Sequence, residues 1–214
     1  MPTSASLKKW MEMPNEEHPK GYGQGIIEVT PVKLLDFNEN PQGYLYDENG
    51  EYIYDSIMIG SWDSNASNVI SNLGGNELLK FVEYGRGLLL GHDTITSSFG
   101  LGSTFYKTFS NKLGILNNSS PTVGRNKVYI NKKSIFTKYP WDIGDVGDEL
   151  SIPHSHVQGN QSEENSTFLK FKFDKFGTTS NISGDYVIED ETYTNRWFLT
   201  IKNNIGAIQT GHSN

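Results

Sequence analysis

In the middle of the chain, short apolar runs alternate with segments whose apolar residues recur at helical spacing. Apolar residues dominate two runs, 55–60 and 88–90, of the length that forms strands buried in a sheet. Between them, leucine and valine recur at helical spacing across residues 76–84, and a glycine-containing turn follows. Residues 104–113 repeat the helical pattern. This strand–helix–strand–helix order predicts a parallel sheet with crossover helices.

The start of the chain shows a different pattern. Residues 1–25 contain three prolines and several glycines, and they predict an irregular lead-in with one short helix at 7–13. Residues 26–35 have strand character that Pro31 interrupts, which predicts an edge strand or a bulge. Residues 38–52 predict a turn-rich loop.

Short, partly alternating segments separated by polar turns fill the last third. They predict antiparallel strands that extend the sheet or cover one of its edges. The segments are residues 127–136, 167–176, 185–190 and 196–211. The whole pattern predicts an α/β fold with a mostly parallel sheet, flanking helices and antiparallel additions in the C-terminal third. We expect one domain over residues 26–214, after the lead-in.

Composition narrows the functional classes. The chain has 214 residues, 35% of them hydrophobic, a formal net charge of −7 and no cysteine. The negative charge argues against binding to nucleic acid or to an anionic membrane surface. The missing thiols exclude disulfides, thiolate metal sites and a cysteine nucleophile. No apolar run reaches the roughly 20 residues of a membrane-inserted helix. The abundant Asn and Ser and the abrupt C-terminus predict a piece cut from a longer protein.

The apolar run 88–90 leads directly into Gly91-His92-Asp93-Thr94. Ligands of open α/β sheets bind outside the carboxyl ends of the strands, and Gly91 suits a tight turn there. Asp63 and its neighbour Trp62 follow the other predicted strand in the same way. These residues predict a site at the strand ends. The alternative is structural, with Asp93 capping the next segment and His92 bonding a loop carbonyl.

Further histidines lie beside strand ends or turns. His154 and His156 are two residues apart, so an extended segment places them on one face, and Gln158 follows. His212 ends another apolar run. Such a cluster suits acid–base or metal chemistry where the fold brings the segments together. No metal-family signature is complete, so a bound divalent metal ion stays open, and no other cofactor is indicated.

Several segments together resemble a known family. DSIMIGSWD and ELLKFVEYGRGLLLGHDT are similar to the core of the ThuA-like proteins, which belong to the class I glutamine-amidotransferase-like superfamily. NNIGAIQTGHSN resembles the late strand of that family, which ends in Gly-His. YPWDIG and HSHVQGNQ also resemble a related bacterial domain of unknown function, found in large surface or secreted proteins.

The resemblance implies a flavodoxin-like sheet and a single amidotransferase-like domain. It places His92 where amidotransferases carry their nucleophilic cysteine, and His212 near the same end of the sheet. Thioester chemistry is excluded, because the chain has no cysteine. ThuA-like relatives are associated with sugar metabolism, so a saccharide or sugar derivative is the implied ligand class.

The first functional hypothesis is a non-catalytic or glycan-binding module of a larger bacterial surface or secreted protein. Its partners would be a saccharide and the other domains of that protein, and its location extracellular or at the cell surface. Aromatic side chains stack on sugar rings. The aromatics expected to be exposed are Trp62, Tyr139, Trp141, Tyr193 and Trp197.

The alternative hypothesis is a hydrolase or lyase that acts on a carbohydrate derivative. His92 would be a general base or ligand-orienting group, Asp93 its partner, and His212 or His156 a second acid–base group. A divalent metal ion is a variant of this mechanism. The residues expected to bind the ligand are Trp62, Asp63, His154, His156 and Gln158.

Overall fold

The computed structural model describes residues 8–9, 11–12, 27–60, 70–91, 94, 104–116, 122–138, 142–158, 161–171 and 197–210. Side chains are not described for residues 104–107, 116, 122–125, 153–158, 161 and 164. The described residues of the lead-in, at 8–9 and 11–12, are helical, as the sequence predicted.

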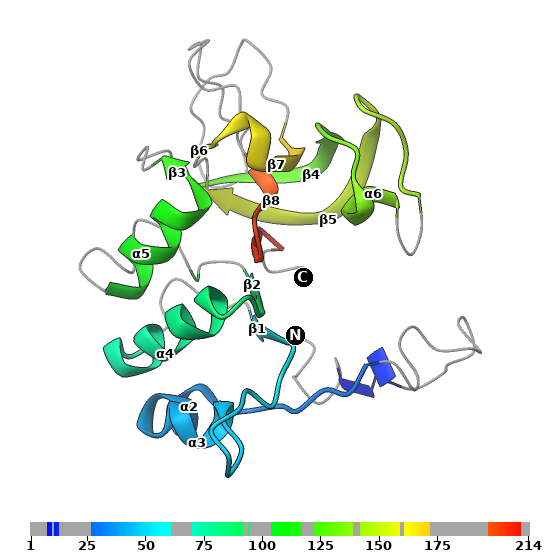
Figure 1. The fold of residues 1–214 in the computed structure, drawn as a ribbon. Helices are drawn as coiled ribbons and strands as arrows, with labels where there is room; N and C mark the ends of the chain where they lie inside the picture. Colours follow the sequence, from blue (N-terminus) through cyan, green and yellow to red (C-terminus); the bar gives the residue numbers. More distant parts are fainter. Residues whose placement is uncertain are drawn as a thin grey trace.

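A seven-stranded mixed sheet forms the centre of the fold (Figure 1). Its strands lie in the order β1-β2-β9-β8-β7-β4-β5. They are β1 (Ser56–Ile59), β2 (Gly87–Leu90), β4 (Thr122–Ile130), β5 (Glu149–Gln158), β7 (Thr167–Lys170), β8 (Trp197–Lys202) and β9 (Ile205–Ile208). A separate antiparallel pair joins β3 (Ile115–Leu116) to β6 (Gln161–Ser162).

The predicted α/β fold is confirmed, but the prediction of a mostly parallel sheet is wrong. In the described sheet, β1 pairs with β2 and β2 with β9 in parallel, and the four other neighbouring pairs are antiparallel. Parallel strands need a long crossover, whereas a short turn returns the chain antiparallel. The connection from β8 to β9 is such a turn, with Asn203 at a φ of 56°. The antiparallel additions are confirmed, and they begin earlier than expected, with β4.

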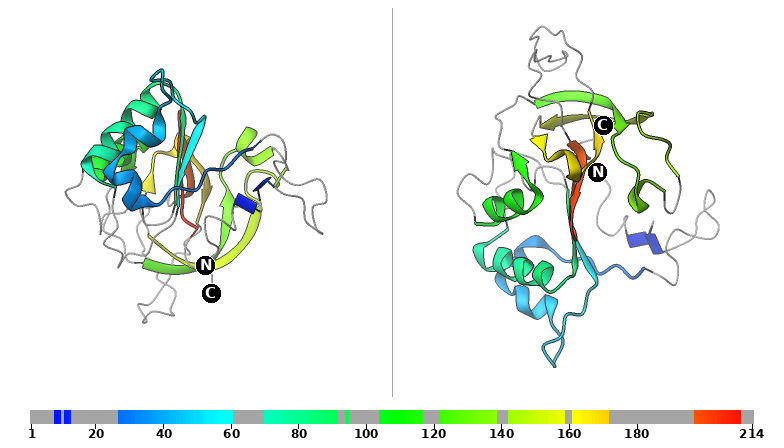
Figure 2. Two further views of the ribbon diagram at one scale, coloured as in Figure 1. Left: turned by 90° about the horizontal axis from the view of Figure 1, so that it is seen from below. Right: turned by 45° about the horizontal axis from the view of Figure 1, so that its top comes forward.

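The longer helices cover one face of the parallel strands. These are α4 (Asn72–Glu83) and α5 (Thr104–Leu113). Figures 1 and 2 show them beside the shorter α2 (Leu34–Glu39) and α3 (Pro41–Leu45), while β4 and β5 curve away from the parallel strands. The remaining short elements are α6 (Ile135–Lys138) and a 3₁₀ turn at Glu164–Ser166.

Local chemistry sets the ends of the two long helices. The Ser71 side chain accepts a hydrogen bond from Gly74 N at 3.0 Å, which caps α4 and starts it four residues before the predicted position at 76. Gly85 follows the helix with a φ of 102°, a conformation that glycine adopts without strain. Helix α5 matches its predicted bounds, and Gly114 ends it with a φ of 65°.

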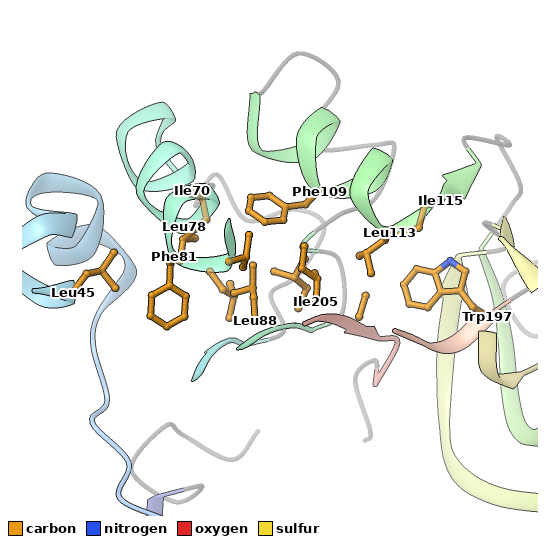
Figure 3. Close-up of a cluster of buried hydrophobic side chains, with 14 residues drawn as sticks. Leu45, Ile70, Leu78, Phe81, Leu88, Phe109, Leu113, Ile115, Trp197 and Ile205 are labelled. Atoms are coloured by element: carbon orange, nitrogen blue, oxygen red, sulfur yellow. The ribbon is translucent and has the colours of Figure 1, made fainter. Parts of the chain in front are cut away.

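The main hydrophobic core lies between these helices and the parallel strands (Figure 3). Burial of each large aliphatic or aromatic side chain contributes about 1.5–3 kcal/mol. The fully enclosed members include Leu78, Phe81, Leu90, Phe109 and Leu113. A second cluster, built on Val128, Ile130, Leu169, Phe171 and Phe198, belongs to the antiparallel strands. The two clusters lie on one continuous sheet, and the single domain expected over residues 26–214 stays a prediction.

Four sequence predictions are corrected and a fifth is left open. Residues 27–33 form neither helix nor strand, and α2 begins where the predicted strand 26–35 ends. The loop 38–52 contains α3 as well as the expected turn. Strand β1 is not buried on both faces, because it is the edge strand and its Met58 is 49% exposed. Trp197, expected at the surface, is 2% exposed within the core (Figure 3). The predicted strand 185–190 lies outside the described residues.

Asn204 ties the β8–β9 turn to the end of α4, and its loss should destabilise the fold. Its Nδ2 donates to Val82 O at 2.7 Å and to Arg86 O at 2.5 Å. Asn204→Ala should lower the free energy of unfolding by about 1–3 kcal/mol, because two carbonyls lose their donor. Urea denaturation measures this loss. Asn111→Ala, at an exposed position of α5, should stay within about 0.5 kcal/mol of the wild type. Equal losses in both variants would contradict the role of Asn204.

Candidate functional site

The three parallel strands end together at one edge of the sheet. Ile59 of β1 lies opposite Leu90 of β2, and Leu90 lies opposite Ala207 of β9. All three strands run in the same direction, so the chain leaves the sheet at this edge three times. This is the edge at which open α/β sheets bind their ligands.

The predicted catalytic residues and two of the predicted ligand-binding residues follow these three strand ends along the chain. Trp62 and Asp63 come after β1, His92 and Asp93 after β2, and His212 after β9. All five lie outside the described residues. The strand registers bring the preceding segments to a common edge, and the convergence of the side chains themselves stays a prediction.

A hydrogen-bonded turn follows β2. Gly91 N donates to Ile59 O at 2.9 Å, which continues the sheet pairing by one residue. Gly91 O accepts from Thr94 N at 3.4 Å and from Thr94 Oγ1 at 2.7 Å. Gly91 and Thr94 are both buried. The predicted tight turn at Gly91 is therefore confirmed, and Thr94 closes it.

A buried glutamine follows β9. Gln209 is 3% exposed, its N donates to Phe198 O at 2.9 Å, and its Nε2 donates to Trp197 O at 2.7 Å. These bonds fasten the end of β9 to β8. The sequence reasoning assigned no role to Gln209 or Thr94. The available signal was the same for both residues, a polar side chain close behind an apolar run, but it was applied only to the histidines, the aspartates and Trp62.

The other predicted ligand residues lie on a different part of the sheet. His154, His156 and Gln158 belong to β5, where His156 pairs with Gly124 and Gln158 with Thr122. Strands β9, β8, β7 and β4 stand between β2 and β5 in the sheet order. The side chains of these three residues are not described, so their part in a ligand site stays a prediction.

A polar cluster that the sequence reasoning missed lies between α3 and α4. Glu77 is 2% exposed and is the one buried ionisable side chain among the described residues. Its Oε1 accepts from Lys80 Nζ at 2.7 Å and from Gln42 Nε2 at 3.1 Å, and its Oε2 accepts from the Tyr46 hydroxyl at 3.0 Å. The Tyr46 ring stacks on Tyr52 with centroids 4.6 Å apart. The signal in the sequence was a carboxylate on the apolar stripe of a helix.

The partners of Glu77 decide its protonation. Burial raises the pKa of its carboxyl, but hydrogen bonds from Lys80, Gln42 and Tyr46 together outweigh burial and hold the pKa below its ordinary value. Burial, followed by the hydrogen bonds with Tyr52 and Glu77, raises the pKa of Tyr46 well above its ordinary value. A charged carboxylate with three donors suits a structural link between the two helices better than proton transfer.

Comparisons with other proteins leave the family open. A scan against protein-family models, a search of curated proteins and a search of solved structures found no match. Within the described residues, no helix is long and apolar enough to cross a membrane. Also within that part of the chain, no three His, Asp or Glu side chains form a group that could hold a metal ion.

Stability should depend on pH through Glu77. A carboxyl whose pKa is lower in the folded than in the unfolded protein stabilises the fold above the unfolded value, here about 4.5, and that stability is lost as the pH falls through the folded value. Glu77→Gln should therefore melt at a lower temperature than the wild type at pH 7, and the difference should shrink below about pH 4.5. Thermal unfolding followed by circular dichroism between pH 3 and pH 7 measures it. The exposed Glu48→Gln should follow the wild type, and a parallel offset at every pH in Glu77→Gln would refute the linkage.

Proposed function

We propose that the chain is a sugar-binding module that holds a saccharide or sugar derivative where β1, β2 and β9 end. The module belongs to a larger bacterial surface or secreted protein and has no amidotransferase activity, because it has no cysteine nucleophile. The observation that carries the proposal is the common edge of the three parallel strand ends. Trp62 and Asp63, His92 and Asp93, and His212 follow those ends in sequence.

The chemistry of these residues suits a sugar. An indole ring offers an apolar face to the C–H groups of a pyranose, as Trp62 would. Carboxylates and imidazoles accept and donate hydrogen bonds to hydroxyl groups, as Asp63, Asp93 and the histidines would. A cleft with one aromatic platform and a few convergent polar groups is the ordinary composition of a small-ligand site.

The proposal extends to a flavodoxin-like, ThuA-like origin of the parallel part. In support, β1, α4 and β2 form a strand–helix–strand unit, the Gly91 turn follows it, and α5 comes next along the chain. β9 then lies parallel beside β2 and runs toward the Gly-His pair at 211–212. The antiparallel strands β8, β7, β4 and β5 would be additions to that core.

A hydrolase or lyase acting on a carbohydrate derivative is the second candidate. The order of the residues favours it, because His92 and Asp93 directly follow β2 at the edge where open α/β sheets bind their ligands. His92 would act as general base with Asp93 as its partner, and His212 as the second acid–base group. A divalent metal ion is compatible with this chemistry.

Sugar binding can be tested with variants at two of the strand ends. Saturation-transfer NMR against a panel of monosaccharides and oligosaccharides should identify a ligand, and calorimetry should then give its affinity. Trp62→Ala and His92→Ala should each weaken binding about tenfold, since one stacking or hydrogen-bonding contact is worth about 1.4 kcal/mol. His18→Ala, which replaces the histidine of the lead-in, should bind as the wild type does.

The same samples separate the two candidate functions. New product signals that disappear in His92→Ala and in a further variant, His212→Ala, would favour the enzyme. Their loss on addition of a chelator would indicate that a metal ion takes part. Binding without turnover supports the module. The proposal fails if no sugar of the panel binds at millimolar concentration, or if all three variants bind like the wild type.

A further inference from the structure

We propose that the Asn49-Gly50 bond is a site of self-modification, at which Asn49 is converted to aspartate or isoaspartate without the help of another protein. The conversion alters the turn between α3 and β1, and it weakens the packing of Tyr52 on Tyr46. This inference is independent of the sugar-binding proposal. It rests on residues 46–52, all of which the structure describes.

The reaction depends on the residue that follows the asparagine. The main-chain nitrogen of Gly50 attacks the side-chain carbon Cγ of Asn49, a new N–Cγ bond forms, and Nδ2 leaves as ammonia with the proton of the Gly50 N–H. Water then opens the cyclic imide at either carbonyl and gives aspartate or isoaspartate. A side chain on the following residue hinders the attack, and glycine has none. Asn49-Gly50 is the only Asn-Gly pair in the sequence.

The bond lies at the surface, where the ring of the cyclic imide has room to form. Asn49 and Gly50 are both exposed. Apart from its chain neighbours, a Cβ placed on Gly50 would have no heavy atom within 4 Å. Figure 2 shows the segment between α3 and β1 projecting from the helices. Water can therefore reach the site, and no other part of the described chain blocks it.

Asp47 holds the turn in a conformation that opposes the reaction. Gly50 N, the attacking atom, donates to Asp47 O at 3.0 Å. Asp47 Oδ1 accepts from Asn49 N and from Glu51 N, both at 2.9 Å. These main-chain hydrogen bonds, that of Glu51 first, hold the pKa of the Asp47 carboxyl below its ordinary value, so the acceptor is charged at neutral pH. The rate of modification then depends on how often the bonds at Asp47 open.

Modification changes the segment that joins Tyr46 to Tyr52. The two residues form an isolated antiparallel bridge across the turn, and their hydroxyl oxygens lie 2.9 Å apart. The Tyr46 hydroxyl also donates to Glu77 Oε2 at 3.0 Å. Isoaspartate adds one carbon to the main chain within this bridge, and a carboxylate at position 49 repels the charged Asp47. Both changes should loosen the tyrosine pair, and with it one link between α3 and α4.

The turn between β8 and β9 contains a matched control. Asn203 is exposed there with a φ of 56°, but Asn204 follows it and carries a side chain. Gly50→Asn reproduces that order of residues in the first turn. Asparagine tolerates the positive φ of 80° at position 50 better than most residues do.

The first measurement is the rate of conversion, followed by peptide mass spectrometry during incubation at pH 7 and at pH 9. Asn49 should convert about tenfold faster than Asn203, and faster at pH 9, because the attacking nitrogen must lose its proton. Gly50→Asn should slow conversion at position 49 about tenfold. Asp47→Ala should speed it about tenfold, since the hydrogen bonds that hold the turn are lost.

Two variants of the same turn serve as controls for Asp47→Ala. Asp47→Asn keeps an acceptor oxygen, and its rate should stay close to that of the wild type. Glu48→Ala removes a neighbouring carboxylate whose side chain forms none of the hydrogen bonds given above, and it should also match the wild type.

The second measurement is the melting temperature of the modified chain. Anion-exchange chromatography separates it from the unmodified chain, and circular dichroism follows the unfolding of each. The isoaspartate form should melt about 2–4 °C lower, the shift expected for the loss of one packing contact in a domain of this size. Asn49→Asp, which carries the charge without the additional carbon, should lose less. Asn49→Gln should keep its melting temperature throughout the incubation.

Each outcome supports or overturns the inference. Equal rates for Asn49 and Asn203, or for Gly50→Asn and the wild type, overturn it. An isoaspartate form that melts like the unmodified chain overturns the effect on the tyrosine pair, and an unchanged rate in Asp47→Ala overturns the control by Asp47. The comparison of Asn49 with Asn203 uses the unaltered protein, so it decides the matter even where a variant does not fold. None of these results depends on a bound sugar, so the sugar-binding proposal can fail separately.

Discussion

The parallel pairing of β9 with β2 joins the two halves of this fold. β9 bonds β2 on one side and β8 on the other, so the helix-covered strands and the antiparallel strands share one continuous sheet. Small residues allow that central position. A Cβ on Gly206 would lie 3.3 Å from Leu89 Cδ1, and Ala207 is completely buried. Because β9 comes near the end of the chain, the core beneath α4 and α5 is completed only by contacts of long sequence separation.

The polar side chains at the two ends of the parallel strands make different hydrogen bonds. At the end where β2 and β9 begin, Asn204 links the β8–β9 turn to the last turn of α4. Its side chain donates hydrogen bonds to carbonyl groups at the end of that helix and just beyond it. At the opposite end, Thr94 and Gln209 are buried, and their bonds go to main-chain oxygens of the sheet and its turn. The buried polar groups at this end thus hold the backbone in place.

Sequence reasoning succeeded where local pattern and local chemistry agree. The helical spacing and the glycines around it located α4 and α5, and the apolar runs located β1 and β2. It failed where contacts with residues distant in sequence determine the structure of a segment. Residues 34–39 carry no strong helical stripe, yet they form α2, which the Asn38 side chain helps to join to α4 through Ser71 N at 2.8 Å. The parallel direction of β9 likewise depends on β2 rather than on its own residues. For the candidate site, position in the sequence indicated the strand ends, whereas the buried supports, Thr94 and Gln209, required the three-dimensional structure.

Some buried polar residues support the fold, and they differ from the residues that could act on a ligand. Glu77 is charged and buried, the usual marks of an active site, but its oxygens accept from Gln42 of α3, from Lys80 of α4 and from Tyr46, which directly follows α3. Its charge therefore stabilises the packing of α3 against α4. His92 and Asp93 differ in their place in the chain, because they come directly after β2, at the edge where the three parallel strands end. Open α/β sheets bind their ligands at such an edge, and this makes the end of β2 a better candidate for recognition than the buried carboxylate.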